Sequence, residues 1–267
     1  MSFFTVEGLA AGYGRRPVLS GVDFTLEAGK LYGVLGANGS GKTTLLKAAC
    51  GILPHRGRCL LEGQALETQS VRMRARQCGY IPQRSGIGID LSALEVVLMG
   101  FNPQLGLLER PSAAMQAKAR EALRQVGLED RADENYQHLS EGQKQLCILA
   151  RTLAADARLL LLDEPESALD FQHRHRLLAL LRGWAGAGAG AGRRAALVAL
   201  HDPALALNGC DGLLILAEGR VQGTLRPAAD EPAAIEAALR ILYGPVSVRR
   251  CQNRAGNPQL VLLKEEG

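Results

Sequence analysis

Short apolar runs separated by glycines make up the first part of the chain. Between residues 3 and 35 this pattern predicts three strands, the last of them at residues 31–35. A glycine-rich loop follows and leads into a helix that is predicted to begin near Lys42. The order strand, glycine loop, helix is therefore present near the N-terminal end of the sequence.

After residue 91 the apolar pattern changes to helical spacing. Residues 91–130 carry apolar side chains three and four positions apart, as at Leu94, Val97 and Leu98, without any strand pattern. This segment predicts an inserted helical subdomain.

Helices and strands then alternate to the end of the chain. The pattern predicts a helix from Leu139 to residue 155, then a strand at 159–162, a helix at 170–184 and a strand at 195–200. Such alternation indicates a mainly parallel sheet flanked by helices. The tail from residue 230 predicts one helix, at 232–243, and two strands.

One stretch has no side chain large enough to pack. Residues 185–192 alternate alanine and glycine, which predicts a floppy surface connector between the helix and the strand on either side of it.

Composition bounds the possibilities further. The 267 residues are 47% hydrophobic and 22% charged, as expected for one large globular α/β domain with a smaller insertion. No apolar run approaches the ~18 residues of a membrane span, and the first residues do not resemble a signal peptide, so we expect the chain neither to span nor to cross a membrane by itself.

Charge and cysteine content point to no special partner. The net charge of +4 is small and basic residues are interleaved with acidic ones, so a nucleic-acid partner is not expected. The six cysteines form no C-x-x-C pair and lie mostly in apolar segments, which favours buried reduced thiols over a metal site or disulfides. The histidines at positions 55, 138, 173 and 175 are interpreted as solvated surface residues.

Residues 36–44, Gly-Ala-Asn-Gly-Ser-Gly-Lys-Thr-Thr, match the phosphate-binding pattern G-x-x-x-x-G-K-[ST] between a predicted strand and a predicted helix. Small residues let the backbone N–H groups approach phosphate oxygens at the positive end of the helix. We expect Lys42 to neutralise the β- and γ-phosphates and Thr43 to bind Mg²⁺. A simple glycine-rich helix cap explains the glycines but not the Lys-Thr pair.

A second motif ends the strand at residues 159–162. Asp163 and Glu164 follow this apolar run, which places both carboxylates at the edge of the sheet where the phosphates are expected. We expect Asp163 to hold Mg²⁺ and Glu164 to orient, or accept a proton from, the water that attacks the γ-phosphate. The alternative is that Asp-Glu-Pro only begins a turn.

The residues between and after these motifs resemble the ATPases of ABC transporters. Leu139-Ser-Glu-Gly-Gln143 resembles the family's signature motif, and Ser140 is a suitable helix N-cap. Gly79-Tyr-Ile-Pro-Gln83 resembles the Q-loop, His201-Asp-Pro203 the switch histidine, and Ser167-Ala-Leu-Asp170 the D-loop. Six motifs occur in the family's order between about residues 4 and 226.

The resemblance implies an ATP site shared between two copies of the chain. ATP is expected to contact Tyr13, Gly36, Asn38, Gly39, Ser40, Gly41, Lys42, Thr43 and Thr44 of one copy, and Ser140, Gly142 and Gln143 of the other. The expected Mg²⁺ ligands are Thr43, Gln83 and Asp163. Catalysis is expected to depend on Glu164, His201, Gln83 and Lys42.

The implied fold is α/β: a P-loop NTPase core with a mainly parallel sheet, an antiparallel β subdomain and an inserted helical subdomain. The nucleotide-binding core is expected at residues 3–83 and 157–226, the helical and signature subdomain at 84–156, and a C-terminal extension of unassigned role at 227–267. The implied partners are a second ATPase subunit, membrane permease subunits and, indirectly, an external substrate-binding protein. The implied location is the cytoplasmic face of the membrane.

Residues 96–103, 107–112 and 166–171 resemble the ATPases of bacterial importers for iron-siderophores, haem and cobalamin. The alternatives are another ABC importer or exporter, a soluble ABC protein, and a small-molecule kinase that shares only the phosphate loop. Two departures from the family pattern, Glu141 in the signature and Glu166 before the D-loop, are not expected to remove a main phosphate contact.

Overall fold

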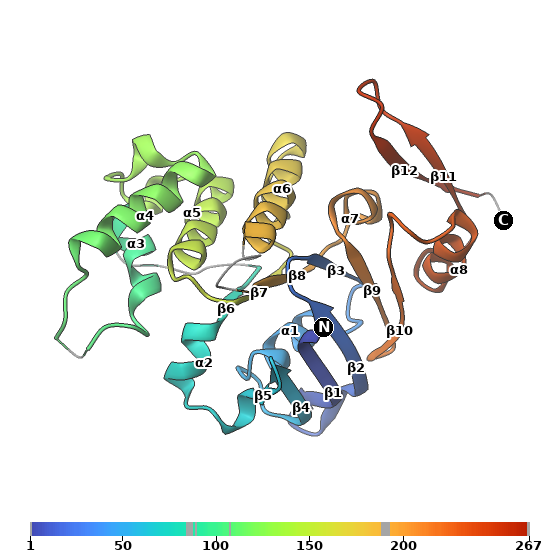
Figure 1. The fold of residues 1–267 in the computed structure, drawn as a ribbon, viewed down its shortest axis with the longest axis horizontal. Helices are drawn as coiled ribbons and strands as arrows, with labels where there is room; N and C mark the ends of the chain where they lie inside the picture. The colour runs from blue at the N-terminus through green and yellow to red at the C-terminus, as the bar shows by residue number, and fades with distance from the viewer. Residues whose placement is uncertain (1, 84–87, 89, 107, 188–192, 266–267) are drawn as a thin grey trace.

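The computed structural model describes residues 2–83, 88, 90–106, 108–187 and 193–265. Its centre is a six-stranded sheet in the order β10-β9-β3-β8-β7-β6. Helices cover one face of this sheet, and a four-stranded antiparallel sheet lies on the other side (Figure 1). The α/β architecture expected from the alternating pattern is confirmed.

The central sheet is parallel except at one edge, where β10 pairs antiparallel with β9. Its strands are β3 (Leu31–Leu35), β6 (Cys78–Ile81), β7 (Leu159–Asp163), β8 (Ala195–Ala199), β9 (Gly212–Ala217) and β10 (Arg220–Leu225). Every residue of β3, β7 and β8 is buried, which explains why these strands are continuous apolar runs rather than alternating ones.

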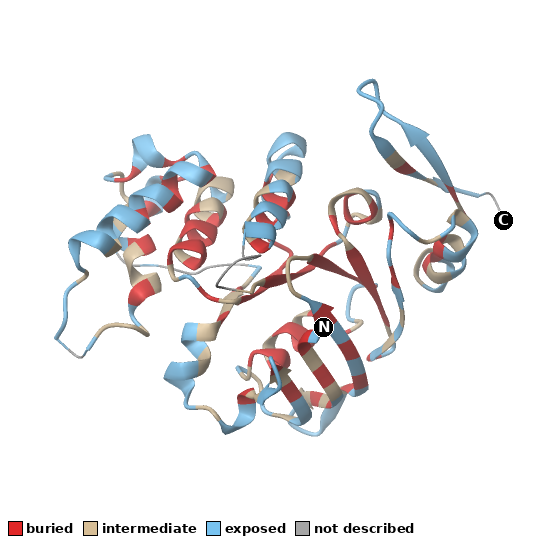
Figure 2. Cartoon of the chain, in the orientation of Figure 1, coloured by how far each residue is buried: buried red, intermediate tan, exposed pale blue. Residues whose placement is uncertain are grey.

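Two hydrophobic cores lie on the two faces of this sheet. Successive residues of β7 alternate between them: Leu160 and Leu162 belong to the helical core, and Leu159 and Leu161 to the core under the antiparallel sheet. The buried residues follow these inner faces, while the outer helix faces are exposed (Figure 2). The strand that carries Asp163 is thus held from both sides.

The antiparallel sheet has the order β2-β1-β4-β5. Its strands are β1 (Ser2–Tyr13), β2 (Arg16–Glu27), β4 (His55–Leu61) and β5 (Gln64–Ala65). Phe4 and Phe24 meet edge to face across β1 and β2, with ring centroids 6.2 Å apart. Helix α1 (Lys42–Ala49) buries Leu45 and Leu46 in the core between the two sheets.

In the chain, a helical layer follows β6, the strand at one edge of the central sheet. It contains α3 (Ala93–Leu98), α4 (Ala113–Val126) and α5 (Glu141–Ala154), together with the 3₁₀ turns η2 (Met99–Phe101), η3 (Glu129–Arg131) and η4 (Tyr136–His138). The 3₁₀ turn η1 (Leu66–Thr68) and helix α2 (Val71–Gln77) precede β6. Ser92, Ser112 and Ser140 each accept a backbone N–H as the N-cap of α3, α4 and α5. These caps fix where the helices begin.

The C-terminal part joins three helices to a hairpin. It contains α6 (Phe171–Ala187), α7 (Pro203–Gly209), α8 (Pro232–Tyr243), β11 (Val246–Gln252) and β12 (Pro258–Lys264). The Asn208 side chain donates to the Leu260 carbonyl at 2.9 Å and accepts from the Leu260 N–H at 2.8 Å. This pair of hydrogen bonds attaches the hairpin to α7.

The prediction for residues 185–192 is wrong at its start. Helix α6 continues through Ala187, because Ala185 is fully buried and its packing favours one more turn than the glycine content suggests. The rest of that run, residues 188–192, lies outside the described residues.

Two surface predictions need correction as well. The His55 side chain is only 7% exposed, so it is not a solvated surface histidine. Five cysteines are buried as expected, whereas Cys251 is exposed on the hairpin.

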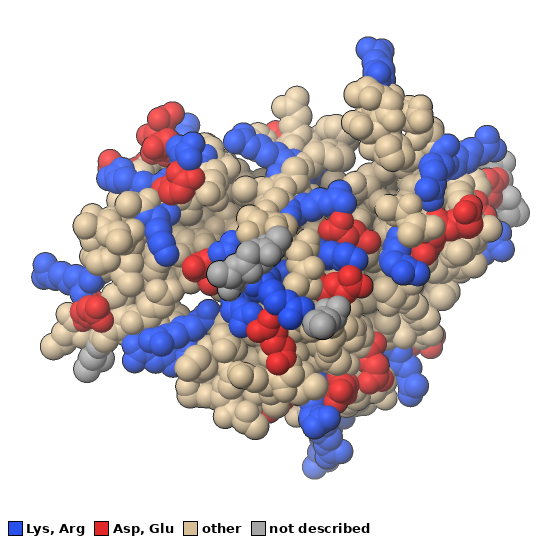
Figure 3. All heavy atoms as spheres, viewed as in Figure 1, with Lys and Arg blue, Asp and Glu red and all other residues tan. Residues whose placement is uncertain are grey.

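On the face in Figure 3, basic and acidic side chains are interspersed over most of the surface. Among the described residues, no helix is both long and apolar enough to cross a bilayer.

Candidate nucleotide-binding site

The glycine-rich loop joins the buried strand β3 to helix α1. Gly41 is the N-cap of α1, with a left-handed φ of 107°, and it offers no side chain to accept the first N–H groups of the helix. No acidic residue lies in the first turn. The helix therefore presents uncapped N–H groups and its positive end to the loop, which suits an anion.

Close packing restricts the first residue of the loop to glycine. A Cβ at Gly36 would lie 2.4 Å from the Ser40 Oγ and 2.5 Å from the Leu216 carbonyl oxygen. The Gly36 carbonyl also accepts from the Lys42 Nζ at 2.8 Å, and the Lys42 side chain is 5% exposed. The loop thus folds around its own lysine.

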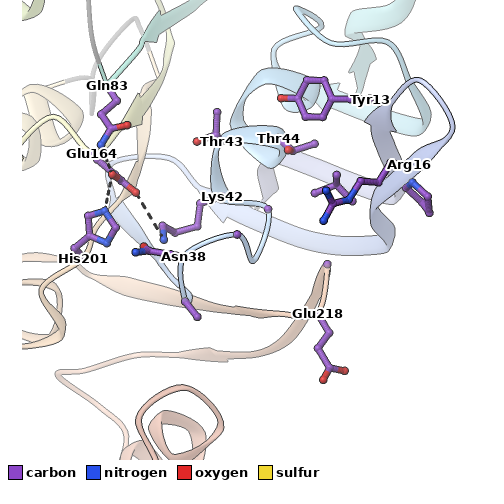
Figure 4. Close-up of a pocket in the computed structure, with 16 residues that line it drawn as sticks. Tyr13, Arg16, Asn38, Lys42, Thr43, Thr44, Gln83, Glu164, His201 and Glu218 are labelled. Carbon is purple, nitrogen blue, oxygen red and sulfur yellow. Dashed lines mark hydrogen bonds and ion pairs between the residues drawn. The ribbon is translucent and has the colours of Figure 1, made fainter.

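A cavity of about 850 Å³ opens over this loop (Figure 4). Its lining is Tyr13, Arg16, Pro17, Val18, Ala37, Asn38, Gly39, Gly41, Lys42, Thr43, Thr44, Gln83, Glu164, His201, Glu218 and Gly219. Gln83, Glu164 and His201 gather at one end, while Tyr13 and Arg16 stand at the other. The cavity therefore has two separate ends, one suited to phosphate groups and one that carries an aromatic side chain.

At the end of β7, Asp163 faces two hydroxyl groups. The Thr43 Oγ1 donates to its Oδ1 at 3.0 Å, and the Tyr80 hydroxyl donates to its Oδ2 at 3.3 Å. Burial raises the pKa of the Asp163 carboxyl, and the hydrogen bond from Thr43 opposes this rise. A carboxylate and a hydroxyl side by side form a hard oxygen donor set, which fits Mg²⁺.

The Glu164 carboxylate collects three side chains from three different segments. Its Oε2 accepts from the Gln83 Nε2 at 2.7 Å and lies 2.5 Å from the His201 Nε2, while its Oε1 lies 3.7 Å from the Lys42 Nζ (Figure 4). Its backbone is left-handed, with φ 52°, and its N–H donates to the Ala199 carbonyl at 3.2 Å. A strained non-glycine residue of this kind is typical of functional sites.

Two residues further on, Glu166 lies beneath the His201 backbone. Its Oε1 accepts from the His201 N–H at 3.2 Å, while its Oε2 is buried with no hydrogen-bond partner among the described residues. Burial raises the pKa of this carboxyl. The chain therefore keeps a buried acid directly below the segment that carries His201.

The residues of the predicted signature lie elsewhere. Ser140, Glu141, Gly142 and Gln143 line a separate cavity of about 460 Å³, together with Ala168, Leu169, Asp170 and His173. Ser140 accepts from the Gln143 N–H at 3.3 Å, and the Gln143 side chain accepts from the Ser140 N–H at 2.9 Å. Within one chain these residues do not line the cavity over the phosphate loop.

The structure thus brings most of the predicted residues together and separates a few. Tyr13, Asn38, Gly39, Gly41, Lys42, Thr43, Thr44, Gln83, Glu164 and His201 line the larger cavity. Gly36 and Asp163 border it through Lys42 and Thr43, while the buried Ser40 Oγ has no partner among the described residues. The three signature residues belong to the other cavity.

Sequence reasoning missed three residues of the site that have polar side chains. Arg16 and Glu218 line the cavity, and Tyr80 binds Asp163. The only signal for Tyr80 was its place in a strand beside β7, since the parallel register pairs it with Leu161, two residues before Asp163. Nothing in the sequence near Glu218 distinguishes its Glu-Gly turn from other turns.

Comparison with known proteins agrees with this geometry. The family model described as ABC transporter matches residues 19–167. The hemin import ATP-binding protein HmuV of Pseudomonas putida is 37% identical over 262 residues, which cover 96% of this chain and 98% of that protein. HmuV of Bordetella pertussis is 40% identical over 232 residues, covering 83% and 85% of the two chains.

Solved structures agree as well. A putative metal-chelate type ABC transporter in an inward-facing conformation superposes with a TM-score of 0.81 at 25% identity, over 99% of both chains. An ATP-binding subunit of an ABC transporter superposes with a TM-score of 0.73 at 27% identity, over 84% of this chain and 90% of that chain.

Proposed function

Since the chain belongs to the ABC transporter family and is an ATP-hydrolysing subunit of it, we propose that it powers the import of a metal chelate, with haem as the first candidate. The observation that carries the ATP-hydrolysing part of this proposal is the Glu164 carboxylate, which meets Lys42, Gln83 and His201 at one end of the cavity. That arrangement suits hydrolysis of a γ-phosphate.

In the proposed complex the phosphates of ATP lie over the phosphate loop. The N–H groups at the start of α1 and the Lys42 ammonium bind phosphate oxygens, and Tyr13 stacks on the adenine at the other end of the cavity. Thr43 and Asp163, with the side-chain oxygen of Gln83, would hold Mg²⁺. A bound Mg²⁺ neutralises charge on the β- and γ-phosphate oxygens.

Hydrolysis requires a water in line with the γ-phosphate and a group to orient it. Glu164 is the proposed base, because its carboxylate lies 3.7 Å from the Lys42 Nζ and it already binds Gln83 and His201. Those two residues leave the carboxylate when nucleotide and water enter, and His201 then turns to the γ-phosphate. Glu166 acts only as a support for the His201 backbone.

A second copy of the chain would complete the site. The signature residues Ser140 and Gly142 lie in their own cavity, away from the phosphate loop of the same chain. In a face-to-face dimer each copy places this cavity and the start of α5 over the nucleotide of the other copy. Closing and reopening of such a dimer would move the membrane subunits through the helical segment.

The proposed cargo rests on the relatives of this chain. The two bacterial relatives are hemin import ATP-binding proteins, and a structural neighbour is a metal-chelate type transporter. ATP-dependent haem uptake into proteoliposomes that contain this chain with its membrane subunits tests the cargo. Uptake of another chelate but not of haem would overturn that part alone.

The dimer and the shared site are tested with Glu164→Gln, which blocks hydrolysis and should trap the closed state. We expect light scattering to report a dimer with ATP and Mg²⁺ and a monomer without them. The control adds Ser140→Arg, which places a bulky cation at the signature. A dimer that forms equally well with this second change would overturn the shared site.

A further inference from the structure

A histidine, a cysteine and a glutamate converge at the edge of the antiparallel sheet, and none of the three lines either cavity of the proposed ATPase site. His55 borders a separate hollow that Tyr13 also lines. The His55 Nε2 lies 3.0 Å from the Glu67 Oε1 and 3.9 Å from the Cys59 Sγ. All three donor atoms lie within 4.8 Å of one another. His55 and Cys59 belong to β4, and Glu67 belongs to η1.

The hydrogen bonds of His55 show what the cluster lacks. Its Nδ1 lies 3.1 Å from the Leu53 carbonyl oxygen, which only accepts, so Nδ1 carries a hydrogen. In the neutral ring the Nε2 then presents a lone pair to the Glu67 carboxylate, which also only accepts. A hydrogen bond between these two atoms needs a proton, carried by the ring or by the carboxyl group, and a metal ion can take the place of that proton.

Burial makes a defined pocket for such an ion. The Cys59 residue is 0% exposed and the His55 side chain 7% exposed, while the Glu67 side chain is 30% exposed. Two ligands are thus fixed within the fold and the third faces solvent, which leaves an entry path for a metal. The Glu67 Oε1 also accepts from the Cys59 N–H at 2.8 Å, which holds the carboxylate in place.

We propose that His55, Cys59 and Glu67 bind a borderline divalent cation such as Zn²⁺, with a water as the fourth ligand. Tetrahedral zinc with ordinary bond lengths places nitrogen and oxygen ligands about 3.3 Å apart and nitrogen and sulfur ligands about 3.6 Å apart. The structure has 3.0 Å and 3.9 Å for these two pairs, so each of them needs a shift of only a few tenths of an ångström. The Glu67 oxygen and the Cys59 sulfur lie within 4.8 Å of each other and close on the ion together. The Leu53 carbonyl orients the imidazole from behind.

The position of Cys59 favours a metal ion over a proton between His55 and Glu67. An imidazolium bound to Glu67 needs no third donor, yet the Cys59 sulfur points to the same Nε2. Binding of Zn²⁺ to Cys59 releases the thiol proton to solvent and leaves a thiolate ligand.

A metal here would clamp the connection that follows α1. Leu53 lies in that connection, β4 begins at His55, and Glu67 lies beyond the β4–β5 hairpin. Zn²⁺ would therefore stabilise the antiparallel sheet against unfolding, without taking part in hydrolysis.

Cobalt provides the test, because only a thiolate ligand gives Co²⁺ a sulfur-to-metal charge-transfer absorption. The full chain, stripped with a chelator, is titrated with Co²⁺ in excess Mg²⁺ and then with Zn²⁺. We expect the absorption to saturate at one Co²⁺ per chain and to disappear when Zn²⁺ displaces the cobalt. Zn²⁺ should also raise the melting temperature.

Matched variants assign the ligands. Cys59→Ser, His55→Gln and Glu67→Gln should each lose or weaken the absorption and the zinc-dependent rise in melting temperature. The controls Cys251→Ser and His138→Gln, both at exposed positions, should keep them. An absorption that is absent from the unaltered chain, or that survives in Cys59→Ser, overturns the proposal. A zinc-dependent rise in melting temperature that is the same in all variants would also overturn the proposal.

Discussion

Replacement of Glu164 by glutamine isolates the charge of one carboxylate at the proposed site. The amide keeps the size and one oxygen of the side chain, so that Gln83 and His201 retain an acceptor at the position they now reach at 2.7 and 2.5 Å. The amide cannot accept a proton from water. The shape of the site should therefore survive while the proposed base is lost.

The expected loss follows from the size of general-base effects. Such catalysis contributes about 10²- to 10⁴-fold, or about 3 to 5 kcal/mol of the barrier. ATP affinity should stay equal or improve, because Glu164 also holds Lys42 at 3.7 Å with both side chains largely buried. At an effective dielectric near 20, two charges this close attract by about 4 kcal/mol before desolvation is counted. Phosphate competes with that attraction for the lysine.

The assay measures phosphate release and ATP binding on the same preparations, at protein concentrations that populate the dimer. Glu7→Gln is the control, since it removes the same charge from an exposed pair with Arg58, 2.9 Å away, and exposed pairs contribute little. We expect kcat of the control to stay within about twofold. If Glu164→Gln keeps kcat within about tenfold, or weakens ATP binding more than about tenfold, the carboxylate is structural and the assignment fails.

Three further changes test other parts of the argument. Lys42→Ala removes a charge-assisted phosphate contact of about 1.5–3 kcal/mol, so calorimetry should find ATP bound about 10- to 100-fold more weakly; unchanged affinity would contradict the phosphate role. Gly79→Ala places a Cβ 2.5 Å from the Thr152 Cγ2 and should cost about 1–3 kcal/mol in urea unfolding, whereas Gly223→Ala, with nothing within 4 Å, should not. Glu166→Gln should stabilise the fold at pH 7, because burial raises the folded-state pKa of Glu166 above its unfolded value and the ionised form is disfavoured in the fold. That gain should vanish as the pH falls below the unfolded pKa of 4.5; a gain that grows on acidification would refute the sign.

Sequence patterns were most informative where local chemistry decides the structure. The four leucines of β7 are buried on both faces, so an uninterrupted apolar run followed by Asp163 and Glu164 was sufficient to predict both the strand and the carboxylates at its end. The phosphate loop was equally readable, because Gly41 and Lys42 act within a few residues of one another.

Non-local contacts explain what the sequence did not reveal. His55 looked like an isolated surface residue, yet the fold of β4 and η1 brings Glu67, twelve residues away, to its ring. The extra turn of α6 depends on the burial of Ala185, which no local propensity indicates. The bond from Tyr80 to Asp163 depends on the register of β6 beside β7, across 83 positions of sequence.

The left-handed backbone of Glu164 has a consequence for how this chain can lose its activity. Glycine adopts φ near 52° freely and asparagine tolerates it, whereas glutamate at such an angle costs about 1–2 kcal/mol. Mutation to either residue would relieve that strain while it removes the carboxylate. Inactive copies of the gene can therefore arise without a folding defect, and only selection on transport, not on protein stability, opposes their spread.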